Sequence, residues 1–218
     1  MLQHLSTIQI IAVAILPTLF AIIVHEVAHG WVAKQLGDHT ADMLGRLTLN
    51  PIKHIDPVGT LLVPIIMIVT LGIAFGWAKP VPIDYRNLRN PKRDMVLVAA
   101  AGPASNLLMA LAWALIAKGA MLLPASMLFA SQPLIYMGSI GILINVLLMV
   151  FNLIPLPPLD GGRVAVGLLP SNLSYSLSKL EPYGLFIILA LFATGFLSKL
   201  IWPAISLVSG AIQALIGL

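Results

Sequence analysis

The sequence predicts an all-α polytopic membrane protein with about five to six membrane helices and a small membrane-associated β-sheet. Of its 218 residues, 59% are hydrophobic and only 9% are charged, and the mean hydropathy is +1.00. So few charges cannot cover an ordinary water-facing surface. Several apolar runs also approach or reach the roughly 20 residues that a helix needs to cross a bilayer. We expect a single membrane-embedded domain over residues 1–218.

Five apolar runs predict the main helices: Ile8 to about Ala33, Val58 to Phe75, Met95 to Ala117, Leu134 to Ile154, and Gly184 to Leu200. A sixth and shorter run, Ala204 to Leu218, follows Trp202 and Pro203, an interfacial aromatic residue and a helix starter. It predicts a tilted span or an in-plane helix, so residues 184–218 form the C-terminal helices.

The predicted sheet comes from two polar connections. Residues Gly45 to Asn50 alternate apolar and polar side chains before Pro51, and residues Ala78 to Ile83 include Pro80 and Pro82. Proline is excluded from central strands but tolerated at a sheet edge. These two runs are therefore expected to be extended and to pair as a small sheet, whose edge could take up a further extended segment by strand addition.

Charge and cysteine content limit the partners and the chemistry. The 12 basic residues exceed the 8 acidic ones, but they lie in short loops between apolar runs, which argues against a nucleic-acid partner. The chain has no cysteine. Disulfides, thiolate nucleophiles and cysteine-ligated metal sites are thereby excluded, and any metal must be held by His, Asp or Glu.

The first apolar run contains Val24-His25-Glu26-Val27-Ala28-His29-Gly30. Histidines four residues apart lie on one helical face, so both can bind one Zn²⁺ while Glu26 reaches a water molecule beside it. Ionisable groups at membrane depth are costly and need a partner such as a dication. The alternative is a pair of histidines lining a water-filled cavity or a proton path.

A third ligand is expected from Asp160, which follows the apolar run Leu134 to Ile154. Prolines break the helix before it, and Gly161 and Gly162 allow close backbone approach. Irregular backbone at membrane depth is tolerated only where it is buried in protein or lines a cavity. Asp160 could instead cap a helix starting near Gly162 or pair with Arg163.

Three motifs in this order resemble the intramembrane zinc metalloproteases of the site-2 protease family, peptidase family M50. They are His25-Glu26-x-x-His29, Ala101-Gly102-Pro103-x-x-Asn106, and Asn152-x-x-Pro155-x-x-Pro158-x-Asp160-Gly161-Gly162. The resemblance places the zinc-site core at about residues 8–163. It implies one Zn²⁺ per chain bound by His25, His29 and Asp160, with Glu26 as the catalytic general base, and it assigns Asn152 and Asn106 to the substrate backbone or the oxyanion. The amide of Asn152 could equally serve to hold helices together.

The same resemblance implies an endopeptidase that cuts in or near transmembrane segments, either in regulated intramembrane proteolysis or in clearing signal-peptide remnants. Its partners would be a transmembrane protein or peptide substrate and membrane lipid, in a multi-pass protein of a prokaryotic inner membrane with its active site toward the cytoplasm. No oligomeric state is predicted. Two other interpretations stay open: a metal-ion or proton transporter with a His/Asp relay, and a metallopeptidase of another lineage using Glu181 as the third ligand.

The run Val58 to Phe75 is expected to be re-entrant or hairpin-like, bent near Pro64 or Gly72. Asp160 and the histidine pair both lie at C-terminal helix ends, so their helices must run in the same direction. The chain between residues 34 and 94 must then return to its own side, and basic residues flank the run on both sides, as cytoplasmic loops do. The alternative is a plain transmembrane helix.

Overall fold

The computed structural model describes residues 5–71, 76 and 78–217. Within these described residues, five helical segments are long and apolar enough to cross a membrane: Thr7–Gln35, Pro91–Met121, Ala125–Asn152, Ser171–Ala193 and Phe196–Ile216. The predicted helical fold class is confirmed, and the chain is a multi-pass membrane protein.

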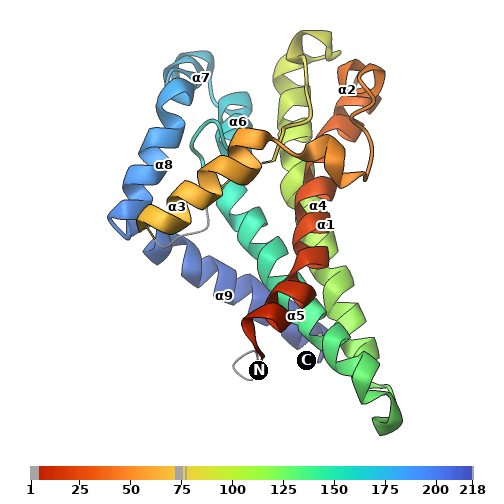
Figure 1. Cartoon of the computed structure of the whole chain (residues 1–218). Helices are drawn as coiled ribbons and strands as arrows, with labels where there is room; N and C mark the ends of the chain where they lie inside the picture. The colour runs from red at the N-terminus through yellow and green to blue at the C-terminus, as the bar shows by residue number, and fades with distance from the viewer. Residues whose placement is uncertain (1–4, 72–75, 77, 218) are drawn as a thin grey trace.

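The helices follow one another as α1 (Thr7–Gln35), α2 (Thr40–Met43), η2 (Pro51–His54), η3 (Pro57–Leu62), α3 (Val63–Leu71), η4 (Tyr85–Asn87), α4 (Pro91–Met121), η5 (Ala125–Met127), α5 (Leu128–Asn152), α6 (Asp160–Leu168), α7 (Ser171–Ser178), η6 (Glu181–Tyr183), α8 (Gly184–Ala193) and α9 (Phe196–Ile216). Helices α1, α4 and α5 pack on one another as the central group, α6 packs on α4, and α9 packs on α5, α4 and α8 (Figure 1).

Helix α1 buries a stripe with a four-residue spacing. Side chains four residues apart share one helical face, and the buried residues of this stripe are Pro17, Ala21, His25, His29 and Ala33. A matching stripe on α4 comprises Asp94, Val98, Gly102, Asn106, Ala110 and Ala114. Small residues in both stripes let the two backbones approach closely. The histidine pair is therefore turned toward α4 and away from lipid.

Glycines on α5 allow a similarly close approach to α4. A Cβ atom at Gly141 would lie 2.3 Å from the ring of Trp113, and one at Gly138 would lie 2.6 Å from the Cβ of Ala117. Neither distance is sterically possible, so glycine is required at both positions. This contact sets α5 beside α4 along the core of the bundle.

Helix α1 ends, and α4 begins, at the same end of the molecule (Figure 1). The N–H of Arg89 donates to the carbonyl of Leu36 at 3.0 Å, and the N–H of Lys79 donates to the carbonyl of His54 at 2.9 Å. The chain thus leaves this end of the molecule after residue 54 and returns to it by residue 79. Such a return is needed if α1 and α5 are to run in the same direction.

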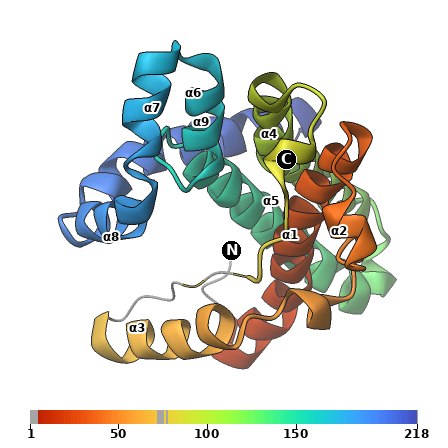
Figure 2. The same cartoon turned by 90° about the horizontal axis from the view of Figure 1, so that it is seen from above.

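Helices η3 and α3 lie within that excursion, and the view from above shows α3 separated from α4 and α5 (Figure 2). Asp56 caps the start of η3, accepting from the N–H groups of Val58 and Gly59 at 2.8 and 2.9 Å. Pro64 is the second residue of α3. Gly72, the other predicted bend, and the last four residues of the predicted run, 72–75, lie outside the described residues.

The predicted β-sheet is wrong: the described parts of the chain, residues 5–71, 76 and 78–217, contain no strand. Gly45 adopts a left-handed conformation with φ of 61° and turns the first run away from an extended path. The second run is extended over residues 78–84, but side chains take its main-chain groups: the Arg46 guanidinium donates to the carbonyls of Lys79 and Pro80 at 3.0 and 3.3 Å. Side-chain bonds thus take the place of the expected pairing between the two runs, and their role in holding a substrate by strand addition stays a prediction.

The end of this extended segment is fixed by Asp38, whose side chain is 1% exposed. Its carboxylate accepts from the hydroxyl and the N–H of Thr40 at 2.5 and 3.1 Å, from the Asn87 amide at 3.1 Å and from the N–H of Asp84 at 2.8 Å. Burial alone would raise the pKa of the Asp38 carboxyl, but these bonds outweigh it and hold the pKa below its usual value. Asp38 therefore remains ionised and fastens residues 84–87 to the end of α1.

The C-terminal helix boundary differs from the sequence prediction. Helix α8 ends at Ala193, Gly195 is left-handed with φ of 71°, and α9 runs from Phe196 through Pro203 to Ile216. The predicted break at Pro203 is therefore wrong, because residues 204–216 continue α9 and do not form a separate helix. Apolar composition is continuous on both sides of Gly195, so only its backbone conformation marks the turn.

Candidate metal centre

His25 and His29 lie one turn apart in the second half of α1, and each is only 7% exposed. Their Nε2 atoms are 3.1 Å apart. The Oδ2 atom of Asp160, the first residue of α6, lies 3.2 Å from His25 Nε2 and 3.3 Å from His29 Nε2. The structure therefore brings together the three side chains that the sequence selected as candidate ligands.

Asp160 reaches the histidines because the chain folds back tightly after α5. A Cβ atom at Gly161 would lie 2.2 Å from the carbonyl oxygen of Leu153, and one at Gly162 would lie 2.1 Å from the nitrogen of Pro157. Only glycine fits at either position. The paired glycines after Asp160 are thus a packing requirement of the turn that delivers its carboxylate.

The alternatives considered for Asp160 do not match its surroundings. Leu159, and not Asp160, is the N-cap of α6. Arg163 points elsewhere: its guanidinium donates to the Tyr85 hydroxyl at 2.7 Å and lies 3.5 Å from a carboxylate oxygen of Glu181. Asp160 instead has its carboxylate oxygen Oδ2 beside the Nε2 atoms of both histidines, which fits a metal ligand better than a helix cap or an ion pair.

Gly102 on α4 forms the wall of the site. A Cβ atom there would lie 2.4 Å from His29 Nε2 and 2.6 Å from His25 Cε1. The glycine backbone therefore lies directly against both imidazoles, and any side chain at this position would enter the space between the candidate ligand atoms.

Hydrogen bonds on the far side of each ring determine which nitrogen carries the proton. His29 Nδ1 lies 2.7 Å from the carbonyl oxygen of Val98, and His25 Nδ1 lies 2.6 Å from Asn106 Oδ1. A carbonyl oxygen can only accept, so each Nδ1 is the donor. In the neutral rings both Nε2 atoms then direct lone pairs toward Asp160.

Three acceptor atoms thus converge without a proton between them. Among the described residues, buried Asp160 Oδ2 has no hydrogen-bond partner, because the two nearest nitrogens are acceptors as well. Zinc at about 2.0–2.1 Å from nitrogen or oxygen ligands in tetrahedral geometry separates those ligands by about 3.3–3.4 Å. The observed separations of 3.1, 3.2 and 3.3 Å fit such an ion closely, and so does the donor set of two imidazoles and one carboxylate.

Glu26 lies beside this cluster without being part of it. Its Oε2 accepts from the N–H of Val81 at 2.9 Å. Pro80 and Pro82 have no N–H, so Val81 provides the only main-chain donor of this tripeptide. The extended segment held by Arg46 and Asp38 therefore fixes one carboxylate oxygen of Glu26 and leaves Oε1 for other chemistry.

The two asparagines assigned to substrate or oxyanion have different surroundings. Asn106 is fully buried behind His25, and its amide also donates to the carbonyl of Ala21 and to Asn145 Oδ1 at 3.1 and 3.0 Å. It holds a histidine and does not face a substrate. Asn152, half-buried at the end of α5, donates to the carbonyl of Leu148 at 3.0 Å, and its substrate role stays a prediction.

Sequence reasoning missed two contributors to the site, the N–H of Val81 and Asn145, and it gave Gly102 no role beyond its place in a motif. Asn145 carried a signal, since it is a polar residue in an apolar helix, seven residues or about two turns before Asn152. The other two act through backbone or through the absence of a side chain, and only the folded chain reveals them.

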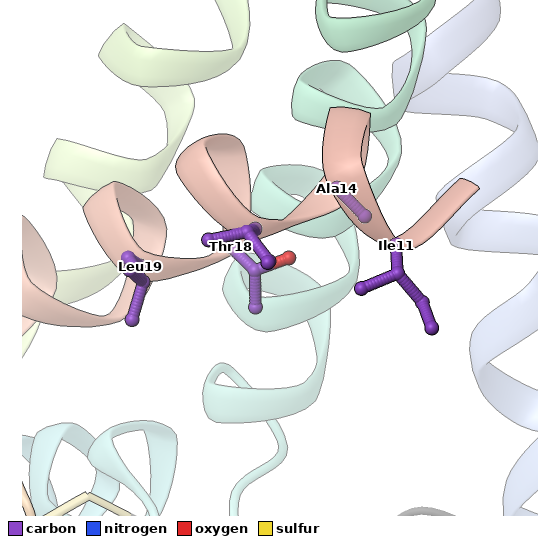
Figure 3. Close-up of a pocket in the computed structure, with 5 residues that line it drawn as sticks. Ile11, Ala14, Thr18 and Leu19 are labelled. Carbon is purple, nitrogen blue, oxygen red and sulfur yellow. The ribbon is translucent and has the colours of Figure 1, made fainter. Parts of the chain in front are cut away.

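Two surface hollows among the described residues include none of the three candidate ligands in their linings. One is an apolar depression on α1 lined by Ile11, Ala14, Ile15, Thr18 and Leu19 (Figure 3). All its residues come from a single lipid-exposed stretch of one helix. We therefore assign it no part in the chemistry.

Similar proteins agree with the zinc chemistry of the site. The chain is 42% identical over 187 residues, 84% of its length and 80% of the relative's, to a Bacillus subtilis protein named "Putative zinc metalloprotease YwhC". It is 29% identical over 199 residues, 91% of its length and 73% of the relative's, to "Putative zinc metalloprotease Rip2" of Mycolicibacterium smegmatis. No family model and no solved structure matches the chain. With the three motifs, this similarity shows that the chain belongs to the site-2 protease family of zinc metalloproteases and that its metal is zinc.

Proposed function

We propose that the chain is an intramembrane zinc endopeptidase in which His25, His29 and Asp160 hold the zinc and Glu26 is the general base. The observation that supports this most strongly is the convergence of three buried lone pairs, two from the membrane-spanning helix α1 and one from Asp160 at the start of α6, with a carboxylate beside them. A buried cluster of this kind is costly in lipid unless a cation occupies it.

The depth of the site supports cleavage within the membrane. Trp31, two residues beyond His29, is 57% exposed, and Lys34 lies in the last turn of α1. Exposed tryptophan and lysine at a helix end are typical of the interface between bilayer and water. Counting back from Lys34 at 1.5 Å per residue places the histidines about 8–14 Å below that interface.

A bound Zn²⁺ supplies Lewis acidity at this site, which polarises a peptide carbonyl and makes water a stronger acid. Glu26 Oε1 takes the proton from the attacking water and delivers it to the nitrogen of the leaving amine. Val81 holds the other carboxylate oxygen during this transfer. We assign Asn152 to the substrate main chain, because it is half exposed and ends the helix just before the turn that delivers Asp160.

We further propose that the metal centre faces the cytoplasm. Eight basic residues lie in the segments between the end of α1 and the first turn of α4: Lys34, Arg46, Lys53, Lys79, Arg86, Arg89, Lys92 and Arg93. Lys118 lies near the other end of α4. Short loops rich in Lys and Arg remain on the cytoplasmic side.

Two other interpretations are not favoured. A metal or proton relay has no need for a carboxylate fixed beside the histidines by a main-chain N–H, as Glu26 is. Glu181 as the third ligand conflicts with its position, because its carboxylate lies against Arg163 and not against the histidines.

The proposal is tested by locating the cleaved bonds. The purified chain, reconstituted in liposomes with a set of single-pass membrane proteins, is expected to cut them within the apolar segment or within about one helical turn of its end, because the site lies below the interface. Mass spectrometry of the products locates the bonds. A zinc chelator should stop cleavage, and added Zn²⁺ should restore it. Cleavage confined to distant soluble regions, or unaffected by the chelator, would contradict the proposal.

A further inference from the structure

Behind His25, side-chain amides form one continuous chain of hydrogen bonds across α1, α4 and α5. His25 Nδ1 lies 2.6 Å from Asn106 Oδ1, the Asn106 amide nitrogen donates to Asn145 Oδ1 at 3.0 Å, and the Asn145 amide nitrogen donates to the carbonyl of Gly141 at 2.8 Å. Both asparagines are 0% exposed. This network lies entirely within the helix core.

The direction of every bond in this network follows from its far end. The carbonyl of Gly141 can only accept, so Asn145 must turn its NH₂ toward it and its Oδ1 toward Asn106. Asn106 must then turn its NH₂ toward Asn145 and the carbonyl of Ala21, which leaves Oδ1 for His25. His25 must therefore carry its proton on Nδ1, with the Nε2 lone pair directed at the metal centre.

We propose that Asn145 is a positioning residue for the zinc site, acting through Asn106 to fix the tautomer and the ring orientation of His25. The inference rests on the proposed role of His25 as a zinc ligand. Asn145 touches no ligand itself. Residues that orient a metal-bound histidine through its other nitrogen influence metal affinity. Here that residue is Asn106, and Asn145 sets its orientation together with the carbonyl of Ala21.

The two histidines differ in what orients their rings, and only His25 depends on a side-chain amide. His29 is oriented by the main-chain carbonyl of Val98, which has a fixed position and can only accept. His25 is oriented by a side-chain amide, which presents a donor if it rotates by half a turn. An amide in this position needs partners that distinguish its two ends, and the carbonyl of Ala21 and Asn145 Oδ1 both accept from its nitrogen.

A buried amide can also serve only to hold helices together, and the two roles make different predictions. Helix association alone predicts that removing the Asn145 amide lowers stability and leaves zinc affinity unchanged. A positioning role predicts weaker zinc binding, which is restored by a replacement whose oxygen still accepts from Asn106. Zinc affinity therefore separates the two roles without reference to cleavage.

The test uses the full chain in detergent, stripped of metal and titrated with Zn²⁺ against a chromophoric chelator. Asn145→Leu removes the acceptor for Asn106 and should raise the zinc Kd about tenfold, the lower end of the effect of groups that support metal ligands. Asn145→Asp should bind zinc like the wild type, because a carboxyl oxygen accepts from Asn106 in either protonation state. Asn145→Ser, whose hydroxyl reaches back only to Gly141, should behave like Asn145→Leu and serves if that variant does not fold.

Ile142→Ala is the matched control for stability, since Ile142 is 2% exposed and packs one turn earlier on α5. It should lower the melting temperature and keep the wild-type zinc Kd. An unchanged zinc Kd in Asn145→Leu or Asn145→Ser would overturn the positioning role. A wild-type chain that binds no zinc in this titration would instead overturn the proposed function on which the role rests.

Discussion

Replacing Glu26 with glutamine is expected to abolish peptide cleavage while one zinc per chain stays bound. Glutamine has the same shape and its carbonyl oxygen can still accept from the N–H of Val81, but it cannot take a proton from water at neutral pH. The loss of a general base costs about 100- to 10,000-fold in rate. Cleavage rate and zinc content, measured on the same preparation, check both halves of this expectation.

Glu181→Gln is the matched control for that variant. It makes the same chemical change at a carboxylate that lies 3.5 Å from Arg163 and outside the histidine cluster, so cleavage should continue near the wild-type rate. If Glu26→Gln cleaves as fast as the wild type, Glu26 is not the base. If Glu26→Gln also loses its zinc, Glu26 is a ligand. Continued movement of an ion across the membrane by this variant would instead indicate a transporter.

Gly102→Ala is expected to remove zinc binding from a chain that still folds. The added methyl carbon would lie 2.4 Å from His29 Nε2 and 2.6 Å from His25 Cε1, so it would occupy the space between the candidate ligands or push the rings apart. Overpacking of this kind costs about 1–3 kcal/mol of stability. Zinc content by elemental analysis, with helical content by circular dichroism, measures the two effects separately.

Gly119→Ala on the same helix provides the control. A Cβ atom at Gly119 meets nothing within 4 Å, so this change should raise stability by about 0.5–1 kcal/mol through better helix propensity and leave zinc bound. Normal zinc content in Gly102→Ala would show that the metal does not lie between the imidazoles where α4 approaches them.

The sequence predicted the parts of the fold that depend on apolar length and helical spacing. Histidines at positions 25 and 29 had to share a face, and the broken helix before Asp160 marked a chain that could return to them. For the histidines and Asp160 to meet, the two helices that carry them to the site must run in the same direction, and the basic loops on both sides of the run Val58 to Phe75 indicated that they do. The structure agrees on each of these points.

The rest depended on contacts that spacing does not encode. The run from Gly45 to Asn50 alternates like a strand, yet the left-handed Gly45 and the bonds of Arg46 to residues 79 and 80 produce a different arrangement. The turn at Gly195 lies in a mostly apolar stretch, and no proline marks it. Asn106 was assigned to the substrate because nothing in the sequence shows that α4 presents it to the back of His25.

Zinc content of Asp160→Asn, compared with the wild type and with Glu181→Gln, tests the central claim most directly. Asparagine keeps the size of the side chain but removes the negative charge that a zinc ligand provides. We therefore expect about one zinc per chain in the wild type and in Glu181→Gln, and a large loss of zinc in Asp160→Asn. Full zinc content in Asp160→Asn, or its loss in Glu181→Gln alone, would contradict a metal centre built from His25, His29 and Asp160.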